Sequence, residues 1–328
     1  MTQELPGMMR AVALDQFGGV EQLRLRTLPV PEVGPEEVLI RVESAGVSEW
    51  DPAEREGWFA RELGIEPRFP YILGSDVAGT VVACGERVEG LRPGDRVYGV
   101  SFLNAKGGAY AEYVVVPAEQ VAPIPPGLSV EEAGAMMISA ITALQGLDDT
   151  LELQTGESLL IFGASGGVGH IALQLAKRMG ARVLAVASGR DGVELVQQLG
   201  ADTAVDGRSE DVLAAARQFA PHGIDAAMLT AGGETAERAL QAVRDGGRVA
   251  YPNGVEPVPK GRPGLMMRSY NGTPNPEVIA RLNRLIQKPG PAPFHVHVAR
   301  TFSLEQAAEA HRALEQHHIG KLTLKPAA

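Results

Sequence analysis

The stretch LLIFGASGGVG at residues 159–169 joins a short apolar segment to a turn of glycines and small residues. It passes directly into IALQLAKRMG, whose apolar residues recur at helical spacing. Where a strand turns into a helix, the free amide N–H groups and the helix dipole favour negative charge, and small residues let a phosphate approach the main chain. The stretch therefore predicts a cradle for a dinucleotide pyrophosphate, formed by Ala164, Ser165, Gly166, Gly167, Val168 and Gly169.

The glycine spacing departs from the strict G-x-G-x-x-G form, because Ala164 occupies the first glycine position before Gly166 and Gly169. A turn of this kind can also serve tight packing alone. The surrounding pattern favours binding, because a strand precedes the turn, a helix follows it, and a second strand, RVLAVAS, comes about twenty residues later.

The residues after that second strand indicate which dinucleotide binds. A carboxylate there would accept hydrogen bonds from an unphosphorylated ribose and repel a 2′-phosphate. This chain has Ser188, Gly189 and Arg190 instead, which favours NADPH and leaves NADH possible. The alternative is that Arg190 is only a solvated loop charge, and Asp191 beside it weakens the local positive field.

Strand and helix patterns alternate from residue 157 to residue 253, which predicts a doubly wound parallel sheet. Ligands of such sheets lie beyond the carboxyl ends of the strands. The residues expected there, beside the nicotinamide-ribose half of the cofactor, are Ala231, Gly232, Tyr251, Pro252 and Asn253.

The first part of the chain has a different pattern. Residues 8–45 and 76–125 carry short alternating apolar segments between Gly and Pro turns, which is typical of a small β barrel or sandwich. The segment 50–70 is charged and irregular and predicts a helical loop. The proline cluster PIPPG at 123–127 marks a boundary, after which Ser129 stands at the N-cap position of a helix.

The composition is that of an ordinary globular protein, with 328 residues, 45% hydrophobic and 21% charged. The formal net charge of -10, with no basic run, argues against a nucleic-acid partner. Cys84 is the only cysteine, which excludes an intrachain disulfide and favours a cytoplasmic location. No run approaches the roughly 18 apolar residues of a membrane span, and no signal pattern is evident. We expect a soluble protein that acts on a small molecule.

Several stretches taken together resemble the medium-chain dehydrogenase/reductase superfamily, within its zinc-independent branch of NADPH quinone oxidoreductases and ζ-crystallin-like proteins. They are AGVSEWD, GSDVAGTVVACGERVEGLRPGDRVYG, GGAYAEYVVVP, SAITALQGL, GASGGVGHIALQLAKRMGARV and GKLTLK. The resemblance implies an α/β protein with a chaperonin-10-like β-rich substrate domain at 1–124 and 293–328 and a Rossmann domain at 125–292. It also implies an active site in the cleft between them and a possible homodimer.

Zinc ligands can be checked against this resemblance. The alcohol dehydrogenases of the superfamily have Cys and His where this chain has Ser48 and Glu49, and His where it has Ser75. Serine is a poor zinc ligand beside thiolate, imidazole or carboxylate. The other metal candidates are His295 and His297, which are expected on one face of a strand, and the pair His317 and His318; they lack a third ligand at suitable spacing. We therefore expect no bound metal.

Without zinc to polarise a carbonyl, acceptors that take hydride readily are favoured, namely quinones and α,β-unsaturated carbonyls. The resemblance implies that Ser48, Asp51 and the loop with Trp58 and Phe59 line the substrate end of the cleft, with Tyr71 a weaker candidate. Relatives commonly have Asn in place of Ser48 and a Tyr in the loop that contains Trp58. The alternatives are a structural cap or ion-pair role for Asp51 and lid packing for the two aromatic side chains.

On the cofactor side, Thr142 matches a threonine near the nicotinamide in relatives, the alternative being a helix threonine bonded to its own backbone. The family's usual phosphate-binding Lys and Tyr align with Gly192 and Gly207, which leaves the 2′-phosphate to Arg190 and Arg208.

The leading hypothesis is a zinc-independent oxidoreductase that transfers hydride from NADPH to a quinone. The first alternative is an NADPH-dependent reductase of the C=C bond in 2-alkenals or enones. The second is a cofactor-binding protein with little turnover, which the altered positions Ser48 and Trp58 keep open.

Overall fold

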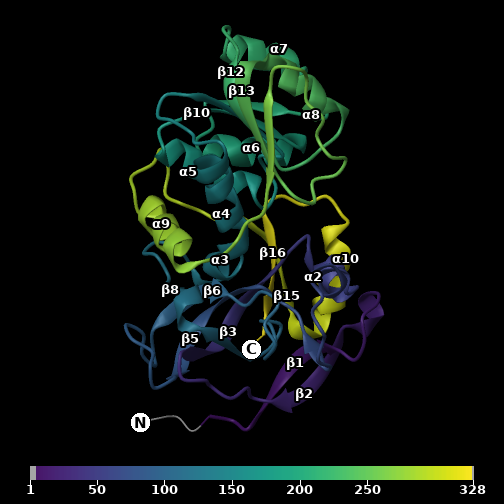
Figure 1. The fold of residues 1–328 in the computed structure, drawn as a ribbon, viewed down its shortest axis with the longest axis vertical. Coiled ribbons are helices and arrows are strands. Elements are labelled where there is room, and N and C mark those ends of the chain that lie inside the picture. The colour runs from purple at the N-terminus through teal and green to yellow at the C-terminus, as the bar shows by residue number, and fades with distance from the viewer. Residues whose placement is uncertain (1–4, 327–328) are drawn as a thin grey trace. The chain divides into compact units, whose positions relative to one another are not determined.

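The computed structural model describes residues 5–326, and its contacts divide the chain into two compact units (Figure 1). The first unit takes in the chain up to Met137 and from Val298 onward, and the second runs from Ile138 to His297. Across the described residues, no helix has the length and apolar character that crossing a membrane requires.

The second unit is built on a six-stranded parallel sheet in the order β11, β10, β9, β12, β13, β14 (Figure 1). The strands are β9 (Ser158–Phe162), β10 (Arg182–Ala187), β11 (Thr203–Asp206), β12 (Ile224–Leu229), β13 (Val243–Pro252) and β14 (Met266–Tyr270). The chain fills one side of the sheet through β11 and then returns to the other side of β9, so the strand order reverses beside β9. Such reversals are where open α/β sheets bind ligands. The predicted doubly wound sheet is confirmed.

Helices connect these strands, and their ends follow from local sequence. They are α4 (Met137–Leu144), the π-helical turn η3 (Gln145–Thr150), α5 (Gly169–Arg178), α6 (Gly189–Gln198), α7 (Val212–Phe219), α8 (Glu234–Ala239), the 3₁₀ turn η4 (Leu240–Ala242) and α9 (Pro276–Ile286). Asp211 Oδ1 accepts from the amides of Leu213 and Ala214, and Asn275 Oδ1 from that of Val278, so both residues are N-caps. Helix α5 packs with α9, and α7 with α8.

The edge strand β14 is absent from the sequence prediction. It follows a proline-rich connection, and Met266, Arg268 and Ser269 leave it without the apolar run of a buried strand. The predicted single helix after Ser129 is also different, because it is divided into α3 (Val130–Gly134), α4 and η3. Ser129 does cap α3, in a capping box with Glu132.

The first unit holds a seven-stranded sheet in the order β15, β16, β3, β5, β6, β8, with β7 also paired to β3, and a three-stranded sheet in the order β2, β1, β4. The strands are β1 (Met8–Leu14), β2 (Arg24–Pro29), β3 (Glu37–Val47), β4 (Tyr71–Ile72), β5 (Asp76–Cys84), β6 (Arg96–Val100), β7 (Tyr113–Pro117), β8 (Val121–Pro123), β15 (Val298–Ser303) and β16 (Lys321–Lys325). Its helices are η1 (Val20–Gln22), α1 (Asp51–Arg55), α2 (Trp58–Leu63), η2 (Ala118–Gln120), α3, η5 (Leu304–Gln306) and α10 (Ala307–Leu314).

The ends of three neighbouring strands of the larger sheet lie side by side. Val47, the last residue of β3, pairs with Leu322 near the start of β16, and Ala45 pairs with Val77 near the start of β5. The end of β3 therefore lies beside the beginnings of β5 and β16. The residues brought together there are Ser48, Ser75 and Lys321.

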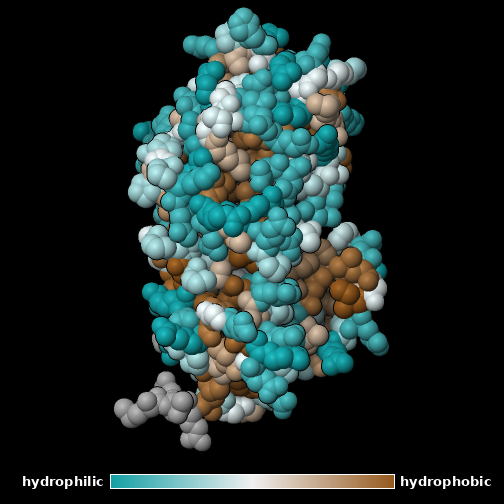
Figure 2. Space-filling view, turned by 60° about the vertical axis from the view of Figure 1, so that its left-hand side comes forward, coloured by the Kyte–Doolittle hydropathy of each residue, from teal (hydrophilic) through white to brown (hydrophobic). Residues whose placement is uncertain are grey.

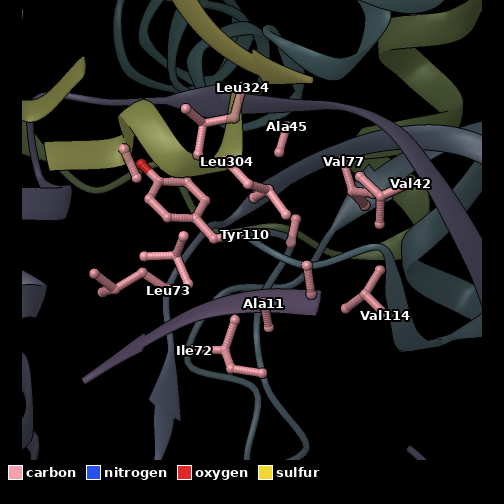
Figure 3. Close-up of a cluster of buried hydrophobic side chains, with 14 of the residues drawn as sticks. Ala11, Val42, Ala45, Ile72, Leu73, Val77, Tyr110, Val114, Leu304 and Leu324 are labelled. Carbon is pink, nitrogen blue, oxygen red and sulfur yellow. The ribbon is translucent and has the colours of Figure 1, made fainter. Parts of the chain in front are cut away.

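Tyr110 places a hydroxyl group in the core of the first unit. Figure 3 shows the ring of Tyr110 among apolar side chains that include Leu73, Leu304 and Leu324. Tyr110 is fully buried, so its hydroxyl must find partners inside the protein.

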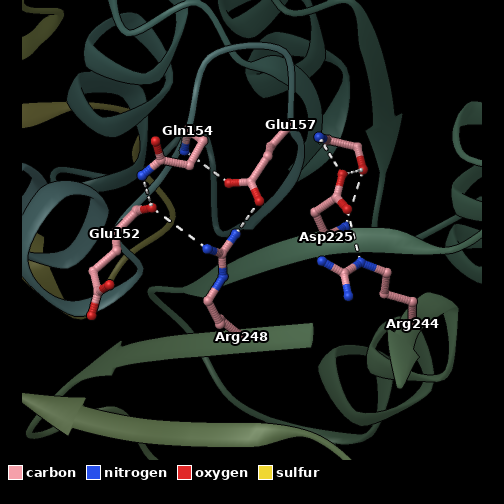
Figure 4. A network of polar contacts seen from close by, with 7 residues as sticks. Glu152, Gln154, Glu157, Asp225, Arg244 and Arg248 are labelled. Carbon is pink, nitrogen blue, oxygen red and sulfur yellow. Dashed lines mark hydrogen bonds and ion pairs between the residues drawn. The ribbon is translucent and has the colours of Figure 1, made fainter. Parts of the chain in front are cut away.

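A polar network fastens the amino ends of the parallel strands (Figure 4). Asp225 accepts hydrogen bonds from the amide and hydroxyl of Ser158 and pairs with Arg244 at 2.8 Å. Arg248 pairs with Glu157 in the same region. The network therefore lies at the end of the sheet opposite the carboxyl end, where open α/β sheets bind their ligands.

Candidate active site

The glycine turn after β9 has the geometry of a close-packed strand-to-helix junction. Gly163 has a φ of +81°, and a Cβ there would lie 2.4 Å from Thr230 Oγ1, so only glycine fits. A Cβ at Gly169 would lie 2.1 Å from the Gly163 carbonyl oxygen, whereas one at Gly166 would meet nothing closer than 3.4 Å. Gly169 therefore serves packing and Gly166 leaves space. Sequence reasoning missed Gly163, although it directly precedes the predicted turn.

The turn presents amide groups at the N-terminus of α5. Within residues 5–326, no hydrogen bond uses the N–H groups of Gly167 or Val168. His170, which is fully buried, donates from Nδ1 to the Gly166 carbonyl at 2.7 Å and accepts at Nε2 from the His297 amide. His170 thus fixes the turn against the backbone of His297. The sequence did not predict this role, because His170 stands in a segment where only the helical spacing of the apolar residues was informative.

The second βα turn is fastened to the first. The amide of Ser188 donates to the buried hydroxyl oxygen of Ser165 at 3.2 Å. A Cβ at Gly192 would lie 2.8 Å from that same oxygen, so a longer side chain at position 192 would displace Ser165. Ser165 is therefore a link between the two turns.

The two arginines predicted for a 2′-phosphate lie on exposed backbone near this turn. Arg190 has a side chain that is 93% exposed and pairs with Glu194 at 2.8 Å. Arg208 adjoins Asp206, whose carboxylate accepts from the amides of Arg208 and Gly189, and these hydrogen bonds lower the pKa of Asp206. A surface hollow of about 190 Å³ is lined by residues that include Arg208, Ser209, Thr235 and Arg238, and Arg190 does not line it.

The predicted nicotinamide-side residues follow the other strands of the sheet. Thr230, before Ala231 and Gly232, donates its hydroxyl to the Phe162 carbonyl at 3.0 Å, which joins the ends of β12 and β9. Tyr251 and Pro252 end β13.

Thr142 and Asn253 both contact the segment that follows β14. Tyr270 donates to the Thr142 carbonyl at 3.0 Å, and the Asn253 side chain donates to Asn271 at 3.0 Å. A Cβ at Gly272 would lie 2.1 Å from Thr142 Oγ1. Thr142 therefore lies beside the residues that end and follow β14.

On the first unit, Ser48 lies against a buried lysine. Lys321 Nζ donates to Ser48 Oγ at 2.9 Å, lies 3.9 Å from Asp76 Oδ2, and sits 5.4 Å from the centre of the Trp50 ring. Ser48 and Lys321 are 3% and 4% exposed. Trp50 Nε1 donates to Ser75 Oγ at 3.4 Å. The sequence analysis did not predict a role for Lys321, although this lysine lies in GKLTLK, one of the stretches that resemble the superfamily.

Asp51 is fully buried beside Ser48. Its Oδ2 accepts from the Ser48 amide at 2.9 Å and from the Tyr110 hydroxyl at 2.6 Å, while Oδ1 is buried with no hydrogen-bond partner within residues 5–326. Burial raises the pKa of Asp51 to about 7, although these hydrogen bonds and Lys321 act to lower it. The structure therefore joins Ser48 and Asp51, both of which were predicted for the substrate end.

Trp58, also predicted for the substrate end, lies on helix α2 and is 48% exposed. Its ring meets Phe59 edge to face at 5.0 Å, and Phe59 meets Phe102 in the same way at 5.5 Å. Figure 2 shows hydrophobic surface on one face of the molecule. The exposed apolar side chains of the α2 region are Trp58, Leu63, Ile65 and Phe69. Tyr71, the weaker candidate, instead donates to Glu54 at 2.6 Å in the interior.

The histidines considered as metal ligands have other surroundings. Among residues 5–326, no three His, Cys, Asp or Glu side chains are grouped so as to hold a metal ion. The rings of His295 and His297 are 6.3 Å apart and precede β15, which begins only at Val298, so they do not share a strand face as predicted. His318 lies 3.8 Å from Glu49.

Residues 34–126 match the family described as Alcohol dehydrogenase GroES-like domain, and residues 167–259 the family described as Zinc-binding dehydrogenase. With the GroES-like β unit, the Rossmann sheet and relatives above 30% identity, the chain belongs to the medium-chain dehydrogenase/reductase superfamily of NAD(P)-dependent oxidoreductases, and it is quinone oxidoreductase-like.

Three similar proteins illustrate this. The NADPH-dependent alkenal/one oxidoreductase, chloroplastic, of Arabidopsis thaliana is 31% identical over 98% of this chain and 81% of its own. The quinone oxidoreductase of Homo sapiens is 34% identical over 74% of this chain and 72% of its own. The structure of the quinone oxidoreductase from Coxiella burnetii has a TM-score of 0.81 and 28% identity, covering 98% of this chain and 100% of that chain.

Proposed function

We propose that this protein transfers hydride from NADPH to a quinone without a metal ion. The observation that carries the proposal is the 2.9 Å hydrogen bond from Lys321 Nζ to Ser48 Oγ. Because lysine only donates, Ser48 accepts here and keeps its own hydroxyl proton for another acceptor. Hydride addition to a quinone leaves negative charge on an oxygen, and a hydroxyl polarised by a buried ammonium is suited to stabilise it.

The residues at this edge do not fit a zinc ion. Ser48 and Ser75 are poor ligands, and the Lys321 ammonium already lies against Ser48 Oγ. A divalent cation at Ser48 would be repelled strongly by a lysine in buried surroundings. We therefore assign the stabilisation of developing negative charge to Ser48, with Lys321 behind it.

The glycine turn fits a dinucleotide, because Gly166 leaves space and the amides of Gly167 and Val168 are available to an anion. We infer that residues 164–169 hold the pyrophosphate and that Ser188, Arg190 and Arg208 hold the 2′-phosphate. The nicotinamide-ribose half would meet Thr142, Ala231, Gly232, Tyr251, Pro252 and Asn253. When bound, NADPH supplies the hydride.

The acceptor is inferred to be flat and apolar. The exposed Trp58 ring, held edge to face by Phe59, offers a surface on which an aromatic acceptor can stack. A quinone has this shape, and its carbonyl oxygen is the group that a Ser48 hydroxyl would bind.

A second candidate is reduction of the C=C bond in 2-alkenals or enones. It is supported by the 31% identity to the alkenal/one oxidoreductase over 98% of this chain. In that reaction, charge also develops on a carbonyl oxygen, so Ser48 would act in the same way.

The test is the rate of NADPH oxidation with matched benzoquinones, naphthoquinones, 2-alkenals and enones. We expect the highest kcat/KM with quinones. A higher kcat/KM with alkenals or enones would replace quinones as the substrate class, and tight NADPH binding without turnover would favour a cofactor-binding protein.

A further inference from the structure

A chain of hydrogen bonds runs from Arg55 to Asp51 through the interior of the first unit. Arg55 Nη1 lies 3.0 Å from His311 Nδ1, His311 Nε2 lies 3.2 Å from the Tyr110 hydroxyl, and that hydroxyl lies 2.6 Å from Asp51 Oδ2. All four side chains are buried, with Arg55 the most exposed at 6%. None of the contacts is therefore weakened by bulk water.

Side-chain chemistry fixes the direction of every contact in this chain. Arginine has no acceptor, so Arg55 donates and His311 Nδ1 must accept. A neutral imidazole that accepts at Nδ1 carries its proton at Nε2, so His311 donates to the Tyr110 oxygen. Tyr110 then has one proton, and it goes to Asp51. The arginine thus sets the tautomer, and the tautomer aims the phenol at the carboxylate.

The two oxygens of Asp51 are left unequal. Oδ2 accepts from both Tyr110 and the Ser48 amide, while Oδ1 has no partner among the described residues. A proton bound by Asp51 therefore goes to Oδ1. The charge of the carboxylate controls how strongly Oδ2 holds the Ser48 amide, because charged acceptors form stronger hydrogen bonds.

We propose that Tyr110 and His311 are positioning residues that act through Asp51 on Ser48, and that the charge of Asp51 sets the pH dependence of hydride transfer. The second half rests on the proposed function, in which the Ser48 hydroxyl stabilises the reduced acceptor. At a pH above the pKa of Asp51, the Ser48 amide donates its hydrogen bond to a charged carboxylate. At a pH below that pKa, the acceptor is neutral, the hydrogen bond is weaker and turnover falls.

The groups around Asp51 determine which of the four hydrogen-bonded side chains changes its charge near neutral pH. The ionisable side chains near it, directly or through one neighbour, are Glu54 and Arg55 of α1, Tyr71 of β4, Asp76 of β5, Tyr110, His311 of α10 and Lys321 of β16. Burial and the charge of Arg55 lower the pKa of His311 to about 3, so His311 stays neutral near pH 7. Burial raises the pKa of Asp51 to about 7. Asp51 is therefore the member that changes charge.

The direct test follows the Ser48 backbone amide by ¹H–¹⁵N NMR in the intact protein without substrate. We expect its chemical shift to titrate with a midpoint near 7, and to stop titrating in Asp51→Asn. Tyr110→Phe removes a donor to the ionised carboxylate and should raise the midpoint by about one unit. His311→Ala should raise it less, and His311→Gln, which keeps a donor and an acceptor, should restore it.

Tyr113→Phe is the matched control, because Tyr113 is a partly buried tyrosine of β7 that takes no part in the hydrogen bonds from Arg55 to Asp51. It should leave the midpoint unchanged. An amide that does not titrate between about pH 5 and 9, or a midpoint that Tyr110→Phe leaves in place, would overturn the proposal.

The kinetic arm uses the same variants. The pH profile of kcat for quinone reduction should rise through the amide midpoint and move with it in Tyr110→Phe, whereas a purely structural role would lower kcat at every pH. A profile that stays in place while the amide midpoint moves would overturn the link to turnover. Absence of turnover with every acceptor would overturn the proposed function. The amide titration would still test whether Tyr110 and His311 act on Ser48 through Asp51.

Discussion

Lys321 and Ser48 are 273 positions apart in the sequence, yet Lys321 Nζ and Ser48 Oγ are 2.9 Å apart in the structure. Strand pairing brings the two residues together, because β3 and β16 are antiparallel neighbours and the end of β3 lies beside the beginning of β16. The contact turns an ordinary serine into a polarised hydrogen-bond donor, and our mechanistic predictions begin from it.

Removing either partner should slow chemistry more than binding. Ser48→Ala and Lys321→Met are each expected to lower kcat for quinone reduction by roughly 10- to 100-fold with little change in KM, because the lost interaction is specific to the transition state. The double variant should be no slower than the slower single one. Ser48→Thr, which keeps the hydroxyl, is the control. Additive losses in steady-state kinetics would show that the two residues act separately.

Gly166 and Gly169 should separate cofactor binding from folding. Gly169→Ala places a Cβ 2.1 Å from the Gly163 carbonyl oxygen and should destabilise the protein by about 2 kcal/mol or more. Gly166→Ala has room within the protein, so we expect near-normal stability and a Kd for NADPH raised about tenfold. Urea denaturation and cofactor titration measure the two effects. If Gly166→Ala bound NADPH normally, the pyrophosphate would not lie on this turn.

Arg190 should determine the preference for NADPH. Its side chain is exposed and pairs only with the neighbouring Glu194 among the ion pairs of the described chain, so a 2′-phosphate can compete for it. Arg190→Ala should raise KM for NADPH about tenfold and leave KM for NADH within about twofold. Glu194→Gln, which releases Arg190, should lower KM for NADPH. Equal effects of Arg190→Ala on both cofactors would remove Arg190 from the phosphate site.

Glu54 should make stability depend on pH. It is 5% exposed, accepts from Tyr71, and burial raises its pKa to about 8. The folded protein therefore holds a proton that the unfolded chain loses near pH 4.3. The stabilisation is complete below that pH and is lost as the pH rises through about 8.

Glu54→Gln keeps the shape and cannot titrate, so its free energy of unfolding should fall less than that of the wild type between about pH 4 and pH 9, by on the order of a few kcal/mol. Urea denaturation at a series of pH values measures this. Glu62→Gln, at an exposed position of the neighbouring helix α2, is the control. Parallel pH profiles for Glu54→Gln and the wild type would contradict a buried, protonated Glu54.

Local patterns gave the parallel sheet and the glycine turn, because a strand, a turn and a helix that follow one another leave a continuous record in the sequence. Contacts between distant segments left no such record. Lys321 meets Ser48, and Tyr110 joins Asp51 to His311, only after β16, the segment before β7, and α10 have packed together. Strand β14 was missed because its exposed edge position allows Arg268 and Ser269 where a central strand would be apolar.

Hydride transfer to a quinone without a metal is the reaction that we propose for this protein. Its most direct test is a single-turnover measurement of NADPH oxidation at 340 nm with a naphthoquinone, on protein treated with a chelator and verified to be free of metal. We predict an unchanged rate and a primary isotope effect with NADPH deuterated at nicotinamide C4. Loss of the reaction after chelation, with recovery on adding zinc, would show instead that the protein needs a metal ion.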